Sequence, residues 1–506
     1  MIGFHCNCEI TTLCLVVLVC SVLSQRLKPP VGVPGTGGEN QEEVCLKWEL
    51  RCKIGHETAC KQFQKHCEDI FDNGESTISG TVPLDRINAG YKGLFGIESL
   101  TRQTTLSDGR VVKLHKVQDL ERTKSLLQLL NKQYAKQLGL TTSQFGHDDS
   151  PFFGGDTVLT PQQAEQLLNA AHRSKFPRSK RKISRFRYAI SKWPRTISFT
   201  FDEEAVAHGK TLDAVRKAAE FWSSQTCLTF VDGIPTNNEP YLVITKHGGC
   251  ASNIGRTQRQ GPQGLHISAG CEEFGIVAHE IGHALGMWHE QSRPDRDKYL
   301  TVIYDNINPD AVYNFFQCED EECTTQNIPY DYGSVMQYGS KAFSINDGPT
   351  LLPLDNFYMA NLGSRKQGPT FYDVKQINHA YCSEDCASVI NRCLHGGYPH
   401  PKQCNTCICP DGFTGPTCTE VPQGSPQQCG GTLYAEDSWI TINSPNYPNS
   451  FEAGQNCVWH LKTSVDQRIQ FEFTGSVFEF IYSPTPLCDW NYVEVKFSRD
   501  LAKTGA

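Results

Sequence analysis

The sequence has no apolar run long enough to cross a lipid bilayer as a helix. Its longest, residues 10–23, has about 14 residues, whereas a spanning helix needs about 20. The net charge of −8 is spread along the chain, and no basic stripe marks a nucleic-acid interface. No Asn-x-Ser/Thr sequon occurs, so N-glycosylation is not indicated. These absences argue against a membrane-spanning protein and against a nucleic-acid-binding protein.

The apolar run instead fits a signal peptide at residues 1–24, because it ends at Val22-Leu23-Ser24, which is typical of a cleavage site. Glu9, and the lack of Lys and Arg before the run, leave an uncleaved membrane anchor as the alternative. The chain has 23 cysteines, and this number favours the oxidising exterior of the cell over the cytosol. We therefore expect a secreted, extracellular protein.

Three histidines and one glutamate gather within residues 279–289: His279, Glu280, His283 and His289. On a helix, residues four apart share a face, so His279 and His283 can bind one metal ion while Glu280 flanks it. A continued helix would carry His289 away from that face, but Gly286 can take a positive φ and turn the chain back. Three neutral imidazoles leave Zn²⁺ an open position for water. The pattern predicts a zinc hydrolase with Glu280 as the catalytic base, and a chance match in a core helix is the alternative.

The same pattern followed by a Met-turn is the metzincin signature, and Tyr332-Gly333-Ser334-Val335-Met336-Gln337-Tyr338 supplies that turn. Together with Arg293-Pro294-Asp295-Arg296-Asp297, these motifs make residues 182–382 resemble the astacin family of zinc endopeptidases. The resemblance implies one Zn²⁺ cofactor, Met336 as an apolar floor beneath it, and Tyr338 as a displaceable ligand that stabilises the oxyanion. It also implies that Glu290 contacts the new amino terminus of the mature enzyme. For Glu290, a solvated acid at a helix end is the alternative.

Residues 25–181 are expected to form a pro-segment, which begins with a Pro/Gly-rich linker. Phe153-Gly154-Gly155-Asp156 resembles the Phe-x-Gly-Asp element of astacin pro-segments, so Asp156 is expected to ligate the zinc in the zymogen only. A pro-segment thiolate is the competing switch, but the four pro-segment cysteines are even in number. Arg178-Ser179-Lys180-Arg181 resembles a furin-type processing site, with trimming at Arg185 as an alternative.

The pro-segment is expected to be helical. Its cysteines suit a stapled hairpin with Cys45–Cys67 and Cys52–Cys60 bonds, although three connectivities are possible in principle. Apolar residues recur at helical intervals over residues 120–138 and predict an amphipathic helix. Thr160-Pro161-Gln162-Gln163 resembles a capping box that opens a helix to about residue 173.

The catalytic region is expected to have a mixed α/β fold. Residues 196–201 alternate like a strand, and the apolar residues between 212 and 222 mark a helix that would back it. Similarity to astacins implies the disulfides Cys227–Cys382 and Cys250–Cys271. Cys318 and Cys323 are extra to the family pattern and are expected to join each other.

Residues 383–419 resemble an EGF-like module, because of Cys407-x-Cys409 and Gly412-Phe413-Thr414-Gly415. The pairing implied by that resemblance is Cys386–Cys404, Cys393–Cys407 and Cys409–Cys418. A domain this small needs such disulfide bonds to be stable.

Residues 429–506 resemble a CUB domain, from Cys429-Gly430-Gly431 to Cys488-Asp489-Trp490-Asn491-Tyr492, and the resemblance implies a Cys429–Cys457 bond. Only 78 residues remain for it, so we expect a truncated domain in which Cys488 lacks its partner. Asn491 stands where calcium-binding versions have aspartate, which argues against that ion.

The predicted fold class is thus an α+β metzincin-like catalytic domain with a helical pro-segment, a small disulfide-rich EGF-like module and a truncated β-sandwich CUB domain. The leading hypothesis is a secreted zymogen of a zinc endopeptidase that hydrolyses extracellular proteins and is activated by a furin-type protease. Its layout resembles nematode astacins, some of which process cuticle collagen, so matrix or cuticle collagen is the expected substrate class.

Two other functions are open. One is a non-catalytic extracellular adhesion or scaffold protein that retains the zinc fold; the other is a metal-dependent deacetylase, against which the Met-turn argues. Arg365-Lys366 falls near the segment that lines the S1′ side in astacins, where basic residues would favour Asp or Glu after the scissile bond. A solvated basic loop explains the pair equally well.

Overall fold

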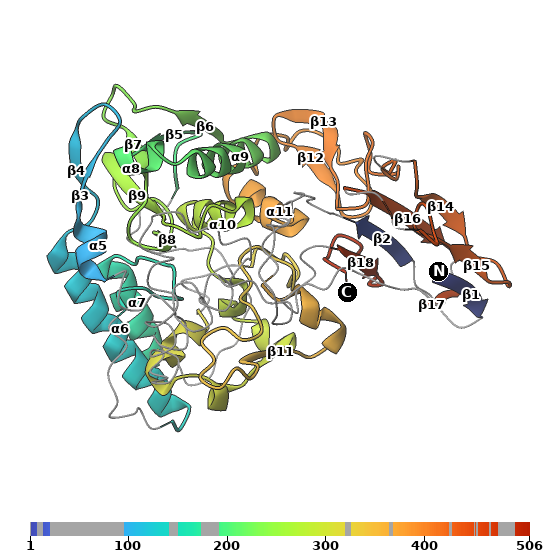
Figure 1. Cartoon of the computed structure of the whole chain (residues 1–506), viewed down its shortest axis with the longest axis horizontal. Coiled ribbons are helices and arrows are strands. Elements are labelled where there is room, and N and C mark those ends of the chain that lie inside the picture. Colours follow the sequence, from blue (N-terminus) through green and yellow to red (C-terminus); the bar gives the residue numbers. More distant parts are fainter. Residues whose placement is uncertain are drawn as a thin grey trace, which may run out of the picture.

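Figure 1 shows the computed structural model of the chain. The structure describes residues 2–7, 14–20, 96–140, 150–173, 192–318, 325–363, 368–424, 428–449, 451, 454–464, 467–473 and 491–505. Several residues named above lie outside these ranges, and their predictions remain predictions: Cys45, Cys52, Cys60, Cys67, Arg178, Lys180, Arg181, Arg185, Cys323, Arg365, Lys366 and Cys488. Within the described ranges, no helix combines the length and apolar character that a membrane span requires.

A five-stranded sheet with the order β6-β5-β7-β9-β8 organises the first half of residues 192–382 (Figure 1). The strands are β5 Thr196–Phe201, β6 Thr229–Asp232, β7 Pro240–Thr245, β8 Cys250–Ser252 and β9 Gly261–Ile267. Neighbouring strands pair in parallel, except that the edge strand β8 is antiparallel to β9. β5 is the strand predicted from the alternation at residues 196–201.

Three long helices share one hydrophobic core with the sheet. They are α9 Gly209–Gln225, α10 Phe274–Ala284 and α11 Phe371–Tyr381, and a short α8 Glu203–Val206 precedes them. α9 contains the predicted apolar stripe, whose Trp222 is fully buried. α11 begins with a capping box between Thr370 and Asp373.

Residues 96–140 and 150–173, here called the N-terminal segment, lie against this region. They form α5 Ile97–Thr101, β3 Gln103–Thr105, β4 Val111–Lys113, α6 Val117–Gln137 and α7 Pro161–Arg173. α6 is the predicted amphipathic helix. α7 opens at the predicted capping box, in which Thr160 N donates to Gln163 Oε1 at 2.8 Å and Gln163 N donates to Thr160 Oγ1 at 3.2 Å.

The N-terminal segment covers one face of the sheet. Every residue of β7 is buried, which requires cover on both faces. Leu242 and Ile244 face the core shared with the helices. Tyr241 and Val243 point the other way, since side chains alternate along a strand, and pack with Leu106 and Leu114 at the β3–β4 hairpin.

After α10 the chain has little regular structure. Its elements are the 3₁₀ helices η1 Glu290–Ser292, η2 Arg296–Lys298, η3 Tyr304–Asn306, η4 Pro309–Phe315 and η5 Asn356–Asn361, and the strand pair β10 Leu300–Val302 and β11 Leu351–Pro353. Its buried residues form a second core together with those of α6 and α7. The N-terminal segment is therefore packed into both halves of the catalytic region.

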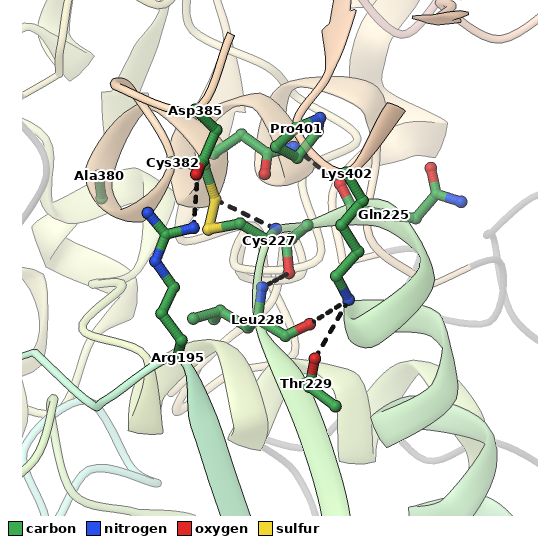
Figure 2. The surroundings of a disulfide bond; sticks show 12 residues. Arg195, Gln225, Cys227, Leu228, Thr229, Ala380, Cys382, Asp385, Pro401 and Lys402 are labelled. Atoms are coloured by element: carbon green, nitrogen blue, oxygen red, sulfur yellow. Dashed lines mark hydrogen bonds and ion pairs between the residues drawn. A yellow bond between two sulfur atoms is a disulfide. The ribbon is translucent and has the colours of Figure 1, made fainter. Parts of the chain in front are cut away.

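Residues 383–419 are tied closely to the catalytic region (Figure 2). They hold β12 Tyr398–His400 and β13 Gln403–Ile408, and three disulfides join Cys386 to Cys404, Cys393 to Cys407 and Cys409 to Cys418. Beside the Cys227–Cys382 disulfide, Arg195 pairs with Asp385 at 2.7 Å. Lys402 Nζ donates to Ser223 O, in the last turn of α9, at 2.7 Å and to Leu228 O, just after that helix, at 2.6 Å.

The C-terminal region contains two small sheets, with the orders β14-β16-β2-β18 and β15-β1-β17. Its own strands are β14 Gly431–Tyr434, β15 Ile440–Ile442, β16 Asn456–Lys462, β17 Arg468–Phe473 and β18 Asn491–Lys496, and a disulfide joins Cys429 to Cys457.

In each C-terminal sheet, one inner strand comes from the expected signal peptide. β1 Ile2–Asn7 lies between β15 and β17, and β2 Cys14–Cys20 lies between β16 and β18. Strands were not expected there, although a run of β-branched and aliphatic residues suits a strand as well as a signal peptide. Removal of residues 1–24 would take an inner strand out of both sheets.

Candidate metal centre

The three predicted histidine ligands converge because of how helix α10 ends. His279 and His283 lie one turn apart on α10 and are fully buried. The helix closes with Gly286 N donating to His283 O at 2.8 Å and Met287 N donating to Gly282 O at 2.9 Å, which is a Schellman motif. Gly286 sits at φ +104°, as predicted for the turn. The reversed chain then brings the ring centre of His289 within 4.7 Å of that of His283.

A fourth buried side chain, Asp156 of the N-terminal segment, completes the cluster. Its Oδ2 lies 3.2 Å from His279 Nε2 and 3.1 Å from His289 Nε2, and its Oδ1 lies 3.4 Å from His283 Nε2. Donors around a tetrahedral zinc, with bonds of about 2.0–2.1 Å, lie roughly 3.3 Å apart. The donor atoms of the four side chains lie close enough to one another to hold a single metal ion. The donor set and its spacing therefore fit one zinc ion.

Hydrogen bonds of the Nδ1 atoms fix the tautomers of two of the histidines. His279 Nδ1 lies 2.8 Å from Val335 O, and His283 Nδ1 lies 2.8 Å from Met287 O. A carbonyl oxygen only accepts, so each Nδ1 carries the proton and each Nε2 presents its lone pair to the metal.

The Met-turn lies directly beneath α10. A Cβ built on Gly282 would be 3.1 Å from Met336 Sδ, so the methionine side chain is packed against the ligand helix. The turn is held by Asp373 of α11, which accepts from Ser334 Oγ at 2.6 Å and from Val335 N at 2.8 Å. The structure thus places Met336 against the helix that carries His279 and His283, and its role as a floor beneath the zinc stays a prediction.

The backbone of the N-terminal segment positions Asp156 along the sheet edge. Ser252 N, on the edge strand β8, donates to Asp156 O at 3.0 Å, and Val158 N donates to Ser252 O at 2.9 Å. Burial alone would raise the pKa of Asp156, but its close contacts with His289 and the other two imidazoles hold that pKa well below its usual range. The side chain is therefore an ionised carboxylate, as a metal ligand must be.

Gly154 brings the N-terminal segment into contact with two more site residues. Its nitrogen donates to Asn314 Oδ1 at 2.8 Å, and the Tyr338 hydroxyl donates to its carbonyl oxygen. Gly154 has φ +66°, and a Cβ there would lie 2.7 Å from His289 Nδ1 and 2.9 Å from Tyr338 Oη. Only glycine fits. This contact of Asn314 could not be predicted from the sequence, because nothing around Asn314 in the chain relates it to Gly154.

Glu280 and Glu290 are both buried beside the histidines. Glu290 Oε1 accepts from Asp331 N at 3.1 Å and from Arg293 Nη1 at 3.2 Å. The expected contact of Glu290 with a new amino terminus involves residues outside the described ranges and stays a prediction. The sequence analysis did not anticipate Arg293 as its partner.

Among the expected disulfides, six are bonded in the structure: Cys227–Cys382, Cys250–Cys271, Cys386–Cys404, Cys393–Cys407, Cys409–Cys418 and Cys429–Cys457. Cys318 is also in a disulfide, and its expected partner Cys323 lies outside the described residues.

The comparison with protein families matches residues 185–382 to the Astacin peptidase family and residues 429–504 to the CUB domain. Among curated proteins, zinc metalloproteinase nas-36 of Caenorhabditis briggsae is 39% identical over 375 residues, 73% of this chain and 59% of that protein. Zinc metalloproteinase dpy-31 of Caenorhabditis elegans is 38% identical over 361 residues, 71% of this chain and 60% of that protein. This chain thus spans about 60% of the length of these relatives.

Among solved structures, high choriolytic enzyme 1, a hatching enzyme zinc-protease of Oryzias latipes, is 34% identical over 37% of this chain and 88% of that chain, with a TM-score of 0.33. The family match and the donor set agree on the metal, which is zinc. Residues 185–382 of this chain therefore belong to the astacin family of zinc metalloproteinases, and residues 429–504 form a CUB domain.

Proposed function

We propose that this chain is the precursor of a secreted zinc endopeptidase that cleaves extracellular proteins after its N-terminal segment has been removed. One observation carries the proposal: three imidazoles of the catalytic region and Asp156 of the N-terminal segment surround one buried point. The first three leave an open position on zinc, and the fourth closes it.

The catalytic roles follow from the residues around that position. Zinc, when bound, supplies Lewis acidity and lowers the pKa of a water molecule. The Glu280 carboxylate accepts a proton from the attacking water and delivers it to the leaving amine. The Tyr338 hydroxyl, which donates to the Gly154 carbonyl in this structure, donates to the oxyanion of a substrate once that partner has left.

The edge strand β8 gives a substrate its main-chain contacts. An extended peptide can add to an exposed strand edge through backbone hydrogen bonds. Asp156 and Val158 make such bonds to Ser252 of β8. The N-terminal segment therefore occupies the place that we assign to the substrate, and it belongs to an inhibitory pro-segment that we assign to residues 25–181.

Release of the pro-segment is assigned to a furin-type protease acting at Arg178-Ser179-Lys180-Arg181. The disulfides and the CUB domain support an extracellular location, and we retain residues 1–24 as the signal peptide. We further propose that residues 383–419 are an EGF-like module which, with the CUB domain, recognises matrix proteins such as cuticle collagen. The three disulfides of residues 383–419 support that assignment.

The test is cleavage of a peptide library by the chain after the pro-segment has been cut off, with Glu280→Gln as the matched control. We expect the cut wild type to hydrolyse peptide bonds, and the variant to lose roughly 10²–10⁴-fold in rate, because the general base and acid is lost. Zinc content and thermal stability should be equal in the two proteins. If both cut proteins bind zinc yet neither cleaves any peptide, the chain is an adhesion or scaffold protein and the proposal is wrong.

A further inference from the structure

The N-terminal segment contacts the catalytic region at a second place, on the sheet face that the β3–β4 hairpin covers. Just after β4, His115 stacks on His266 of β9 with ring centres 5.2 Å apart. Their Nε2 atoms lie 3.0 Å apart. Neither residue is among the metal ligands, and neither takes part in the proposed reaction.

The hydrogen bonds of His266 show which nitrogen carries its proton. Its Nδ1 lies 2.8 Å from His247 O, a carbonyl that only accepts, so Nδ1 is protonated. Nε2 of His266 is then an acceptor, and His115 Nε2 donates a hydrogen bond to it. Both rings are neutral in this arrangement. A second proton on His266 would set two N–H groups against each other, and this imidazole is fully buried.

A third histidine, His247 of the catalytic region, also contacts the N-terminal segment. His247 Nε2 lies 3.1 Å from Thr104 Oγ1 of β3, and its Nδ1 lies 2.6 Å from Thr245 Oγ1. Asp202 is the carboxylate that faces this ring, with Oδ2 at 3.8 Å from Nδ1. At the rim, Arg102 of the N-terminal segment pairs with Glu204 at 2.5 Å, and Lys246 is engaged by Glu272.

We propose that His247 and His266 form a docking site for the pro-segment, separate from the zinc, which holds His115 and Thr104 at neutral pH and releases them when the surroundings become acidic. The proposal deepens the proposed function, since it rests on the N-terminal segment being a pro-segment that dissociates after cleavage. Mildly acidic conditions would then speed the passage from cut precursor to open enzyme.

The direction of the pH effect follows from the docked environment. Burial, with repulsion from His247, lowers the pKa of His115 to about 4. Burial also lowers the pKa of His266, well below its usual range, and that of His247. A released histidine has a pKa of about 6.5. Docking is therefore at full strength above pH ~6.5 and weakens as the pH falls from there toward ~4.

The size of the effect can be bounded from His115 alone. With pKa values of about 6.5 released and about 4 docked, lowering the pH from about 7.5 to about 5.0 weakens docking roughly 30-fold. Protonation of His247 and His266 in the released catalytic region would add to this.

The experiment uses the full chain carrying Glu280→Gln, an affinity tag at its C-terminal end and a site for a specific protease in place of residues 178–181. The chain is cut at neutral pH on the affinity resin, and loss of the pro-segment is followed in buffers from pH ~7.5 to ~5.0. The measured quantity is the amount of pro-segment that stays bound to the resin-held chain. It therefore does not depend on whether the enzyme is active.

Two variants make the test specific. His115→Gln keeps a donor but does not titrate, and His172→Gln changes an exposed histidine on α7 of the same segment as the matched control. We expect the cut wild type and His172→Gln to lose the pro-segment roughly 30-fold faster, or more, at the acid end. His115→Gln should lose most of that dependence. Equal pH dependence in His115→Gln and in wild type would overturn the proposal.

A second measurement needs no variant at His115. Histidine hydrogen–deuterium exchange, read by mass spectrometry at a series of pH values, reports the pKa of His115 in the uncut chain and after the pro-segment has been released. We expect a value well below 6.5 in the uncut chain and one near 6.5 after release. An ordinary pKa of His115 in the uncut chain contradicts the proposal, even if His115→Gln does not fold.

Discussion

At the residue scale, Gly154 shows how tightly the N-terminal segment is fitted over the metal centre. Its φ of +66° and the missing Cβ allow the backbone to pass His289 and Tyr338. Asp156 can reach the three histidines only if the chain passes that close. The motif Phe153-Gly154-Gly155-Asp156 thus contains the ligand together with the glycine that makes room for it.

We predict that Gly154→Ala weakens the masking of the zinc. The new Cβ would lie 2.7 Å from His289 Nδ1, and alanine is strained at this φ by about 1–2 kcal/mol. The uncut variant should therefore hydrolyse a peptide at least about tenfold faster than the uncut wild type. Gly139→Ala is the matched control, because Gly139 has φ +70° in the same segment and open space around its Cβ. If the two uncut variants behave alike, contact with the site is not what requires glycine at position 154.

At the element scale, the end of α10 decides whether the third ligand reaches the metal. The helix alone places His279 and His283, and the Schellman turn at Gly286 returns the chain to place His289. This arrangement could be predicted from the sequence, because helix period, glycine and ligand spacing are all local.

We predict that Gly286→Ala lowers zinc affinity more than stability alone explains. Gly286 has φ +104°, and no atom lies near the position that a Cβ would take, so the substitution introduces backbone strain of about 1–2 kcal/mol without a clash. The strain shifts the chain that carries His289, and zinc affinity should fall about tenfold or more. Gly261→Ala, at φ +83° and equally open, should lose similar stability and keep its zinc affinity. Unchanged zinc binding in Gly286→Ala would show that the turn does not position His289.

Other elements could not be predicted, since they depend on contacts between distant parts of the chain. The β3–β4 hairpin was not expected, because its strands are three residues long and find their apolar partners on β7. His115 and His266 are 151 residues apart, and no local pattern relates them. The leader was expected as a signal peptide, and its two strands in the C-terminal sheets were missed for the same reason.

At the scale of the whole molecule, the structure joins the N-terminal segment to the catalytic region at two sites with different chemistry. One is a carboxylate among the three imidazoles to which we assign the zinc, and the other is a set of neutral histidines on the covered face of the sheet. In the activation that we propose, proteolysis would cut the covalent link and leave both contacts in place. The pH of the medium around the cut precursor should then govern how fast the pro-segment leaves the active site.

The central claim is that one zinc ion is held by His279, His283 and His289 and masked by Asp156. X-ray absorption spectroscopy of the purified, uncut chain tests it most directly. We predict one zinc per chain with three imidazole nitrogens and one carboxylate oxygen, and loss of the carboxylate in Asp156→Ala with the imidazoles retained. Absence of stoichiometric zinc, a sulfur ligand, or a shell that Asp156→Ala leaves unchanged would contradict the account.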